Sequence, residues 1–198
     1  MPIVRIDKKL IYFAHVPKCA GTAIERYLSN RFGPLAFLDW TYSELPTLQR
    51  WNVSSPQHID AASFARLVPA SFLDASFAVV RHPTQRLLSV FRYQRDAEDL
   101  IPAAVSFGSW LRRIPSQGPY YLDNHTRPMA QMVPEDAVVF RLEEGLTPVT
   151  DWLDELAGER REDGSNRGLA SKLRDLQPCS ERYKRILNHA RVPSRDPW

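Results

Sequence analysis

The feature that most constrains this chain is a short apolar segment that runs into a lysine-containing loop and then a helix. Residues 10–16 (LIYFAHV) are apolar and aromatic-rich, and charge and proline bound them, which predicts a buried strand. The loop HVPKCAGT follows at residues 15–22, and apolar residues then recur at helical spacing from Ile24 to Phe32. A strand that passes through a short loop into a helix is the repeating unit of α/β proteins.

The rest of the chain continues this alternation of strands and helices. We predict strands at 35–40, 76–81 and 136–142, and helices at 59–68, 83–98, 107–114, 149–157 and 180–190. Residues 41–57 are predicted to be loop with helical pieces, and residues 158–168 a polar loop. The predicted fold class is therefore α/β, with a mostly parallel central sheet flanked by helices, in a single domain spanning residues 1–198.

Composition excludes some functions and leaves others open. The formal net charge of +3 is too small to indicate a nucleic acid partner, but it allows a local basic pocket for an anionic ligand. Cys19 and Cys179 follow no metal or disulfide spacing, which favours a reducing compartment. The apolar run near the N-terminus is too short for a membrane segment and lacks a cleavage site, so we expect a cytoplasmic protein.

The loop at residues 15–22 has the properties of an anion site. Ligands of parallel α/β sheets sit beyond the carboxyl ends of the strands, and the amides and dipole of a helix N-terminus favour phosphate or sulfate. We expect Gly21 to allow close backbone approach, Lys18 to add a charge and Thr22 to donate a hydrogen bond. The loop is not the common triphosphate loop, because the lysine precedes the glycine. Nor is it a cysteine phosphatase loop, because Arg26 comes one residue too late after Cys19.

A second anion site is predicted at FAVVRHPTQRLLSVFR, residues 77–92. Arg81 ends a strand and Pro83 begins a helix, and Ser89 lies roughly 8 Å along that helix. The arginine and the hydroxyl can hold one phosphate from two directions. The chain thus offers two anion sites on adjacent strand-to-helix junctions.

These two motifs, in this order and spacing, resemble those of sulfotransferases that use 3′-phosphoadenosine 5′-phosphosulfate, especially carbohydrate sulfotransferases and their bacterial relatives. HVPKCAGT is similar to the family's P-K-x-x-G-T loop for the 5′-phosphosulfate, and VVRHPTQRLLSVFR to its V-R-x-P-x-x-R segment for the 3′-phosphate. SPQHI (55–59), NHTRPMAQM (124–132) and FRLEEGL (140–146) resemble further family segments, so the resemblance covers about residues 10–157. It implies a P-loop-like sulfotransferase fold and a donor site made of Pro17, Lys18, Cys19, Ala20, Gly21, Thr22, Ala23, Arg81 and Ser89.

The chain also departs from the family pattern. Cys19 stands where the family has threonine or glycine, and we interpret it as a small residue that fits there; Ala23 replaces the second threonine. Gln131 substitutes for a glutamine expected near Met129. The family's last segment is followed by a further helix, whereas this sequence ends at Trp198, which leaves open what closes the 3′-phosphate end of the pocket.

The resemblance implies in-line sulfuryl transfer to a hydroxyl of a carbohydrate or another small acceptor. Lys18 is expected to stabilise the charge that develops on the leaving 5′-phosphate, and no metal is required. We predict His58 as the general base, because an imidazole titrates near neutrality. His125, Asp60 and Glu143 are the alternative bases, and His125, Arg127 and Glu143 are candidate substrate contacts.

Two other functions remain open on the sequence. One is a nucleotide or small-metabolite kinase, although neither a G-K-[ST] element nor a Mg²⁺-holding acid is evident. The other is a non-catalytic nucleotide-binding module that keeps both anion sites but lacks a base. His15 and His82 are interpreted as structural, and Trp40, Trp51 and Trp110 as core residues or as platforms for a sugar ring.

Overall fold

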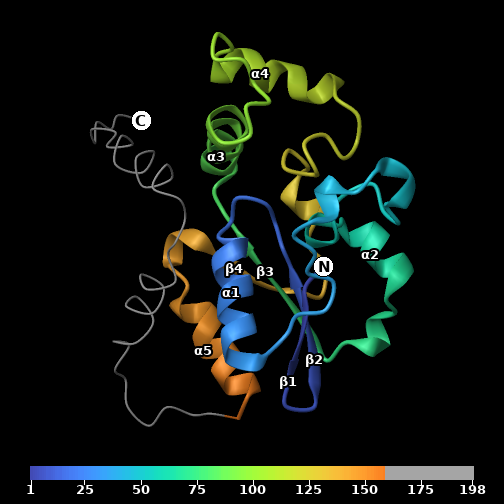
Figure 1. The fold of residues 1–198 in the computed structure, drawn as a ribbon. Helices are drawn as coiled ribbons and strands as arrows, with labels where there is room; N and C mark the ends of the chain where they lie inside the picture. The colour runs from blue at the N-terminus through green and yellow to red at the C-terminus, as the bar shows by residue number, and fades with distance from the viewer. Residues whose placement is uncertain (159–198) are drawn as a thin grey trace. The chain divides into compact units, whose positions relative to one another are not determined.

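The computed structural model describes residues 1–158, which contain a four-stranded sheet in the order β1-β2-β3-β4 (Figure 1). The strands are β1 (Ile3–Ile6), β2 (Lys9–Ala14), β3 (Ala75–Val80) and β4 (Val138–Arg141). β1 pairs antiparallel with β2, whereas β2, β3 and β4 are parallel. The prediction of an α/β fold with a mostly parallel sheet is confirmed.

α1 (Gly21–Phe32) and α5 (Thr147–Leu156) cover one face of the sheet, and α2 (Ala61–Leu67) covers the other. α3 (Pro83–Asp96) and α4 (Phe107–Arg113) pack against each other beyond the end of the sheet (Figure 1). Each of these helices matches a predicted helix within a few residues, and Pro83 occupies the first turn of α3 as expected. No helix within residues 1–158 has the length and apolar character needed to cross a membrane.

The core follows from the alternation of side chains along the strands. Phe13 of β2 stacks on Phe77 of β3 on the face covered by α1 and α5, and Leu28 and Leu153 pack from those helices. Tyr12, one residue earlier, points to the other face and stacks on a phenylalanine of α2. Each such buried apolar side chain contributes about 1.5–3 kcal/mol, so the core holds the two ends of the anion loop firmly in place.

A separate apolar cluster joins α3 to α4. Val90 and Phe91 of α3 pack with Ile101 and with Trp110 of α4. Trp110 is buried there, so this tryptophan belongs to the core and offers no face to a sugar.

The predicted strand at 35–40 is wrong. Within the described chain, Ala36 is the one residue of this segment that pairs, through an isolated bridge to Ile3 of β1. Phe37 then takes a left-handed backbone conformation (φ 59°) that ends the extended chain. Conversely, β1 was not predicted, because its four residues carry a charge and stand at the start of the chain. A two-residue turn at residues 7–8 folds β1 back on β2, where its side chains join the core.

Three predictions concern residues outside the described part of the chain. These are most of the polar loop at 158–168, the helix at 180–190 and the single domain over residues 1–198. The helical pieces predicted within 41–57 are present as short 3₁₀ turns.

Candidate active site

The two predicted anion junctions are neighbours in the structure. β2 and β3 are adjacent and parallel, with Ala14 opposite Ala78. The anion loop (residues 15–22) therefore leaves the same sheet edge as Arg81, which follows β3 directly.

The backbone of the anion loop is arranged to receive an anion. Lys18 (φ 66°) and Ala20 (φ 64°) are both left-handed, although neither is glycine, and this costs about 1–2 kcal/mol for each residue. Left-handed residues that alternate with ordinary ones turn successive amides toward one concavity, which binds anions. Within residues 1–158, no side chain caps the N-terminus of α1, and the first turn of α1 has no acidic residue. The start of this helix therefore favours an anion.

Gly21 has a role that the sequence did not predict. A Cβ at this position would lie 1.8 Å from Nε2 of His15, so the glycine makes room for the His15 ring. The His15 Nδ1 lies 2.6 Å from Oε1 of Glu25, and both side chains are buried. We expected Gly21 to leave space for a ligand. The group that a side chain at position 21 would meet first is instead the His15 imidazole.

One face of α3 lies against the anion loop. Residues spaced three and four apart share a helix face, which places Ser89 between Arg86 and Tyr93. The Arg86 Nε donates to the carbonyl oxygen of Pro17 at 3.0 Å, and the Lys18 ammonium lies 3.8 Å from the centre of the Tyr93 ring. Ser89 is therefore on the side of α3 that faces the anion loop, as a donor site requires.

Arg86 also fixes a second loop. Its Nη1 donates to the carbonyl oxygen of Arg127 at 2.9 Å and its Nη2 to that of His125 at 2.9 Å. Burial lowers the pKa of the guanidinium. The three carbonyl contacts offset the cost of burying this charge.

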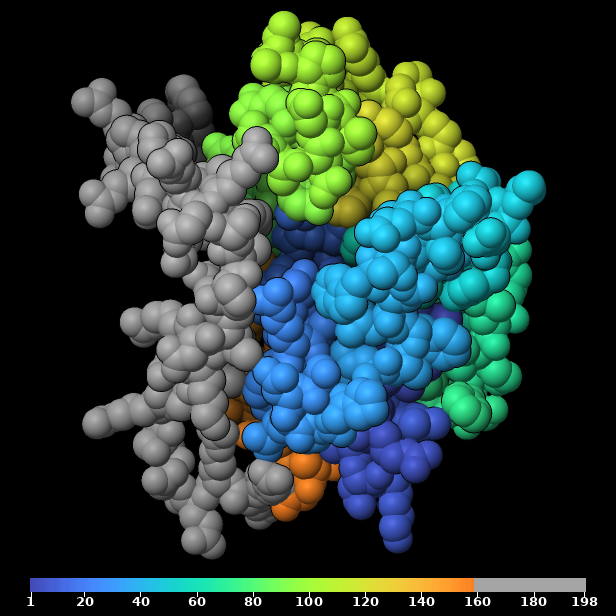
Figure 2. All heavy atoms as spheres, viewed as in Figure 1, coloured from blue at the N-terminus to red at the C-terminus, as the bar shows by residue number. Residues whose placement is uncertain are grey.

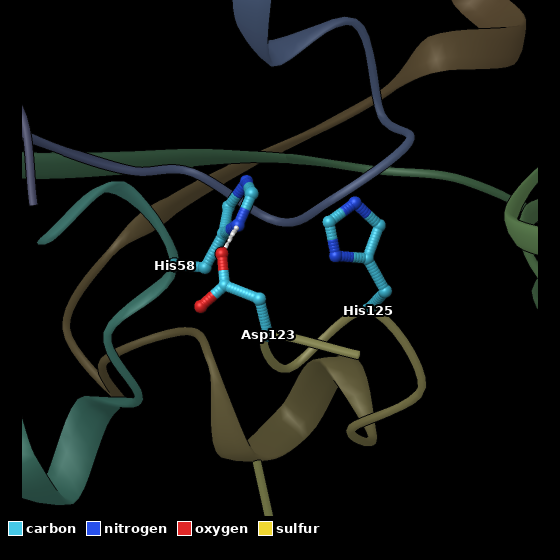
Figure 3. A group of neighbouring side chains, drawn as sticks. All are labelled: His58, Asp123 and His125. Atoms are coloured by element: carbon cyan, nitrogen blue, oxygen red, sulfur yellow. Dashed lines mark hydrogen bonds and ion pairs between the residues drawn. The ribbon is translucent and has the colours of Figure 1, made fainter. Parts of the chain in front are cut away.

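His58 sits at the end of a 3₁₀ turn, Pro56–His58, between two other imidazoles. Its ring centre is 4.8 Å from that of His15 and 4.8 Å from that of His125, in edge-to-face contacts. Its Nδ1 lies 2.6 Å from Oδ2 of Asp123 (Figure 3). The His58 side chain keeps 16% of its surface exposed, so it is reachable although it is held in place.

Burial lowers the pKa of both flanking imidazoles. The His125 Nδ1 donates to the carbonyl oxygen of Leu122 at 2.6 Å, and burial, together with the nearby His58, lowers the pKa of His125 to about 3. Burial likewise lowers the pKa of His15. Burial therefore disfavours the protonated form of both imidazoles that flank His58.

His125 also connects His58 to the anion loop. Its ring stacks on that of Tyr93 with a centroid distance of 5.8 Å and an angle of 4°. Because Lys18 lies over the same Tyr93 ring, the lysine and the histidine row belong to one site.

The remaining candidates make contacts within the protein. Asp60 caps α2 through the Ser63 amide, and its other oxygen lies 3.5 Å from Arg127. Arg127 in turn contacts the side chains of Asn124 and Gln131.

Glu143 lies at the second anion junction. It accepts a hydrogen bond from the His82 amide at 2.8 Å, and this bond lowers the pKa of its carboxyl. The structure therefore groups Glu143 with Arg81 rather than with His58.

The Cys19 side chain of the anion loop packs in the hydrophobic core. It is buried, and burial raises the pKa of its thiol to about 11. This environment agrees with the interpretation of Cys19 as a small residue that fits, since a thiol at that pKa is unreactive at neutral pH.

His58, Asp123 and His125 also form one group whose potential metal-ligand atoms lie within 4.8 Å of one another. The 2.6 Å separation of His58 Nδ1 and Asp123 Oδ2 is a hydrogen-bond length. Two donors on one tetrahedral zinc ion, each about 2.0 Å from it, lie about 3.3 Å apart. We therefore interpret the group as an acid–base arrangement.

Several site residues were not predicted as such. Arg86 lies in the quoted R-x-P-x-x-R motif, whose second arginine was the available signal. Asp123 directly precedes the NHTRPMAQM segment, but neither it nor Glu25 has a local pattern that marks it. Their partners are 65 and 10 residues away in sequence, and only the fold brings them together.

A comparison with known proteins identifies the family of this chain. A family model described as the sulfotransferase family matches residues 1–142, and the chain therefore belongs to that family. The protein is accordingly a sulfotransferase enzyme, a class that transfers sulfuryl groups. Neither the curated proteins nor the solved structures gave a match.

We predict that Gly21→Ala perturbs the site, whereas Gly108→Ala does not. The new Cβ at position 21 would overlap His15, and such overpacking costs about 1–3 kcal/mol. The nearest heavy atom to a Cβ at position 108 is 3.8 Å away, and that glycine lies within α4. Thermal unfolding of both variants measures the difference, and equal melting temperatures would show that the His15 ring is not fixed where the structure places it.

Proposed function

We propose that this sulfotransferase moves the sulfuryl group of 3′-phosphoadenosine 5′-phosphosulfate to a hydroxyl of a carbohydrate or a similar small acceptor. The observation that carries the proposal is a continuous row of side chains that runs from the Lys18 ammonium to the His58 imidazole. Lys18 lies over Tyr93, and Tyr93 stacks on His125. His125 in turn contacts His58.

The donor is assigned to the two anion junctions. In this proposal residues 17–23, through the amides of residues 18–23, and the Lys18 ammonium hold the 5′-phosphosulfate, and Arg81 and Ser89 hold the 3′-phosphate. The left-handed residues of the anion loop and the uncapped start of α1 support the first assignment. The position of Ser89 on the face of α3 between Arg86 and Tyr93 supports the second.

The reaction then proceeds by in-line displacement. The acceptor oxygen attacks sulfur, the bond between sulfur and the bridging oxygen of the 5′-phosphate breaks, and the hydroxyl proton passes to His58 Nε2. Lys18 stabilises the charge that develops on the leaving phosphate. Adenosine 3′,5′-bisphosphate and the sulfated acceptor are the products, and no metal ion takes part.

His58 is favoured over the other candidate bases by its surroundings. A base with a pKa of about 3, as His125 has, is too weak to accept a hydroxyl proton efficiently near neutral pH. Asp60 is buried and engaged at the start of α2, and Glu143 lies at the Arg81 junction.

A carbohydrate acceptor is supported by the surface beside α1. A pocket of about 270 Å³ lies between α1 and the segment after it, two neighbouring regions of the face in Figure 2. The exposed Trp40 ring forms one wall, and polar side chains of α1, from Glu25 to Asn30, form the other. An aromatic face opposite hydrogen-bonding groups suits a sugar ring. Gln57, next to His58, ties this segment to the site by donating to the Asp39 carbonyl oxygen at 2.8 Å.

We predict that adenosine 3′,5′-bisphosphate raises the melting temperature without added metal, and more than ADP does. The 3′-phosphate should provide the difference through Arg81. At 100 times its dissociation constant, the ligand adds about 2.7 kcal/mol to the free energy of unfolding. Thermal-shift assays with and without EDTA measure this. Equal shifts for the two nucleotides, or a strict need for Mg²⁺, would favour a kinase instead.

We further predict that substitutions separate binding from chemistry. Lys18→Ala should lower kcat more than it weakens binding of adenosine 3′,5′-bisphosphate, since its charge matters most in the transition state. Arg81→Ala should chiefly weaken donor binding. His58→Ala and His58→Gln should both lose about 10²-fold or more in kcat with donor affinity retained, because neither can accept the proton.

The matched controls are Lys8→Ala and Arg5→Ala, which remove exposed cations of the β1–β2 hairpin and should leave all constants unchanged. Steady-state kinetics and calorimetry of nucleotide binding give these values. A His58→Gln enzyme with wild-type turnover would exclude His58 as the base.

A further inference from the structure

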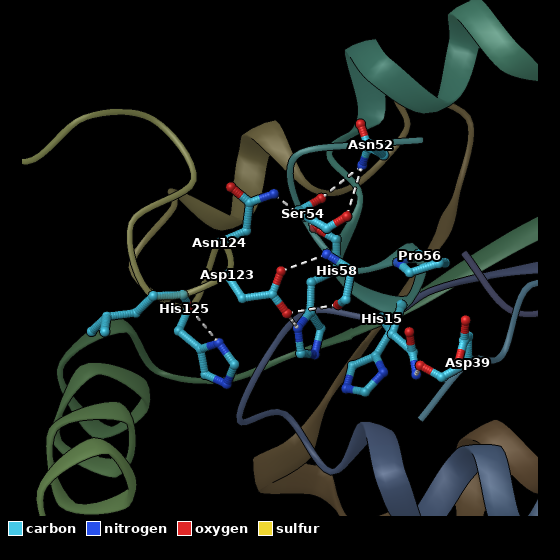
Figure 4. Close-up of polar contacts among 12 residues, drawn as sticks. His15, Asp39, Asn52, Ser54, Pro56, His58, Asp123, Asn124 and His125 are labelled. Atoms are coloured by element: carbon cyan, nitrogen blue, oxygen red, sulfur yellow. Dashed lines mark hydrogen bonds and ion pairs between the residues drawn. The ribbon is translucent and has the colours of Figure 1, made fainter. Parts of the chain in front are cut away.

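The carboxylate of Asp123 is held by three short hydrogen bonds, two of which come from one residue. Its Oδ1 accepts from the Ser55 amide and its Oδ2 from the Ser55 hydroxyl, each at 2.6 Å. The third partner is His58 Nδ1, 2.6 Å from Oδ2 (Figure 4). Burial alone would raise the pKa of this carboxyl, but the hydrogen bonds from His58 and Ser55 outweigh burial and lower the pKa, so Asp123 stays charged.

The loop that carries Asp123 is built around the same histidine. Leu122, Asp123 and Asn124 have φ angles of 52°, 54° and 63°, three consecutive left-handed residues without a glycine. Such a strained backbone persists only where surrounding contacts hold it. One of those contacts is the buried Asn124 side chain, whose Nδ2 donates to the His58 carbonyl oxygen at 2.7 Å. The loop thus holds both the side chain and the backbone of His58.

The geometry points to Asp123 as the positioning residue of the base, an inference that rests on the proposed role of His58. Since a carboxylate only accepts hydrogen bonds, the His58 Nδ1 must carry a proton. The Nε2 is then unprotonated in the neutral ring and can accept the proton of the acceptor hydroxyl. Once His58 is protonated, Asp123 stabilises the imidazolium.

The other titratable groups around His58 do not supply this function. His15, backed by Glu25, faces one side of the ring, and His125, with Lys18 beyond it, faces the other. The two neighbouring histidines meet His58 through ring contacts rather than through a hydrogen bond to Nδ1. Within residues 1–158, Asp123 is the carboxylate that contacts the His58 ring nitrogen.

The test is Asp123→Asn, which keeps the shape of the side chain and removes its charge. An amide nitrogen facing Nδ1 would favour the tautomer with the proton on Nε2, which cannot act as a base. We expect kcat to fall by about 10²–10⁴-fold, with the affinity for adenosine 3′,5′-bisphosphate changed less than about twofold. The acid limb of the kcat/KM profile should move to lower pH, because the imidazolium has lost its counter-charge.

Asp74→Asn is the matched control. Asp74 likewise accepts a hydrogen bond from a backbone amide, that of Leu10 at 2.7 Å, but within residues 1–158 it contacts no histidine nitrogen. This variant should keep both kcat and the pH profile. A similar loss in both variants would mean that Asp123 acts only by holding its loop, and would overturn the inference.

A second measurement does not depend on activity or on a stable variant. In ¹⁵N NMR spectra of the wild-type protein, neutral His58 should be protonated at Nδ1. Protonation at Nε2 would overturn the role of Asp123 even if the enzyme is active. If the wild-type protein transferred no sulfuryl group, the proposed function would fail, while the NMR result would still decide the tautomer.

Discussion

The buried guanidinium of Arg86 joins the three parts of the site that must keep a fixed arrangement. From α3 it reaches the carbonyl oxygen of Pro17 in the anion loop and those of His125 and Arg127 in the loop beside His58. Hydrogen bonds from a charged group contribute about 1.5–3 kcal/mol each. A lysine could not replace this planar fork, because it offers one donor centre rather than three spread over a plane. The anion loop and the loop beside His58 are therefore both held to one helix, in addition to the direct ring contact between His15 and His58.

The site has two halves that differ in their charged groups. Lys18, Arg81 and the start of α1 make one half positive, which suits the phosphates of a nucleotide. The other half is a row of imidazoles in which burial lowers the pKa of His15 and His125, with one carboxylate, Asp123, at its centre. Positive charge on the two neighbours of His58 is thereby disfavoured. The division matches a reaction in which negative charge develops at one end and a proton is released at the other.

The sequence predicted the parts of this arrangement that are encoded locally. The run at residues 10–16 and the proline at position 83 marked the strand and the helix that border the two anion junctions, and hydrophobic periodicity was sufficient for both. It failed at residues 35–40, where a single left-handed residue, Phe37, interrupts an apolar run. Hydrophobic periodicity also did not identify Asp123 and Glu25. A contact between a carboxylate and an imidazole that are separated in the sequence produces no periodic pattern of residues. The role of Gly21 was assigned to a ligand because the nearness of His15 depends on how the loop folds back on α1.

In the proposed function, the two strand-to-helix junctions hold the two ends of one nucleotide. A crystal structure of the protein with adenosine 3′,5′-bisphosphate tests this most directly. We expect the 5′-phosphate to lie on the amides of residues 18–23 with the Lys18 ammonium beside it. We also expect the 3′-phosphate between Arg81 and Ser89, and His58 Nε2 facing the position of the transferred group. A nucleotide bound in the reverse orientation, or bound away from the anion loop, would contradict the proposed donor site.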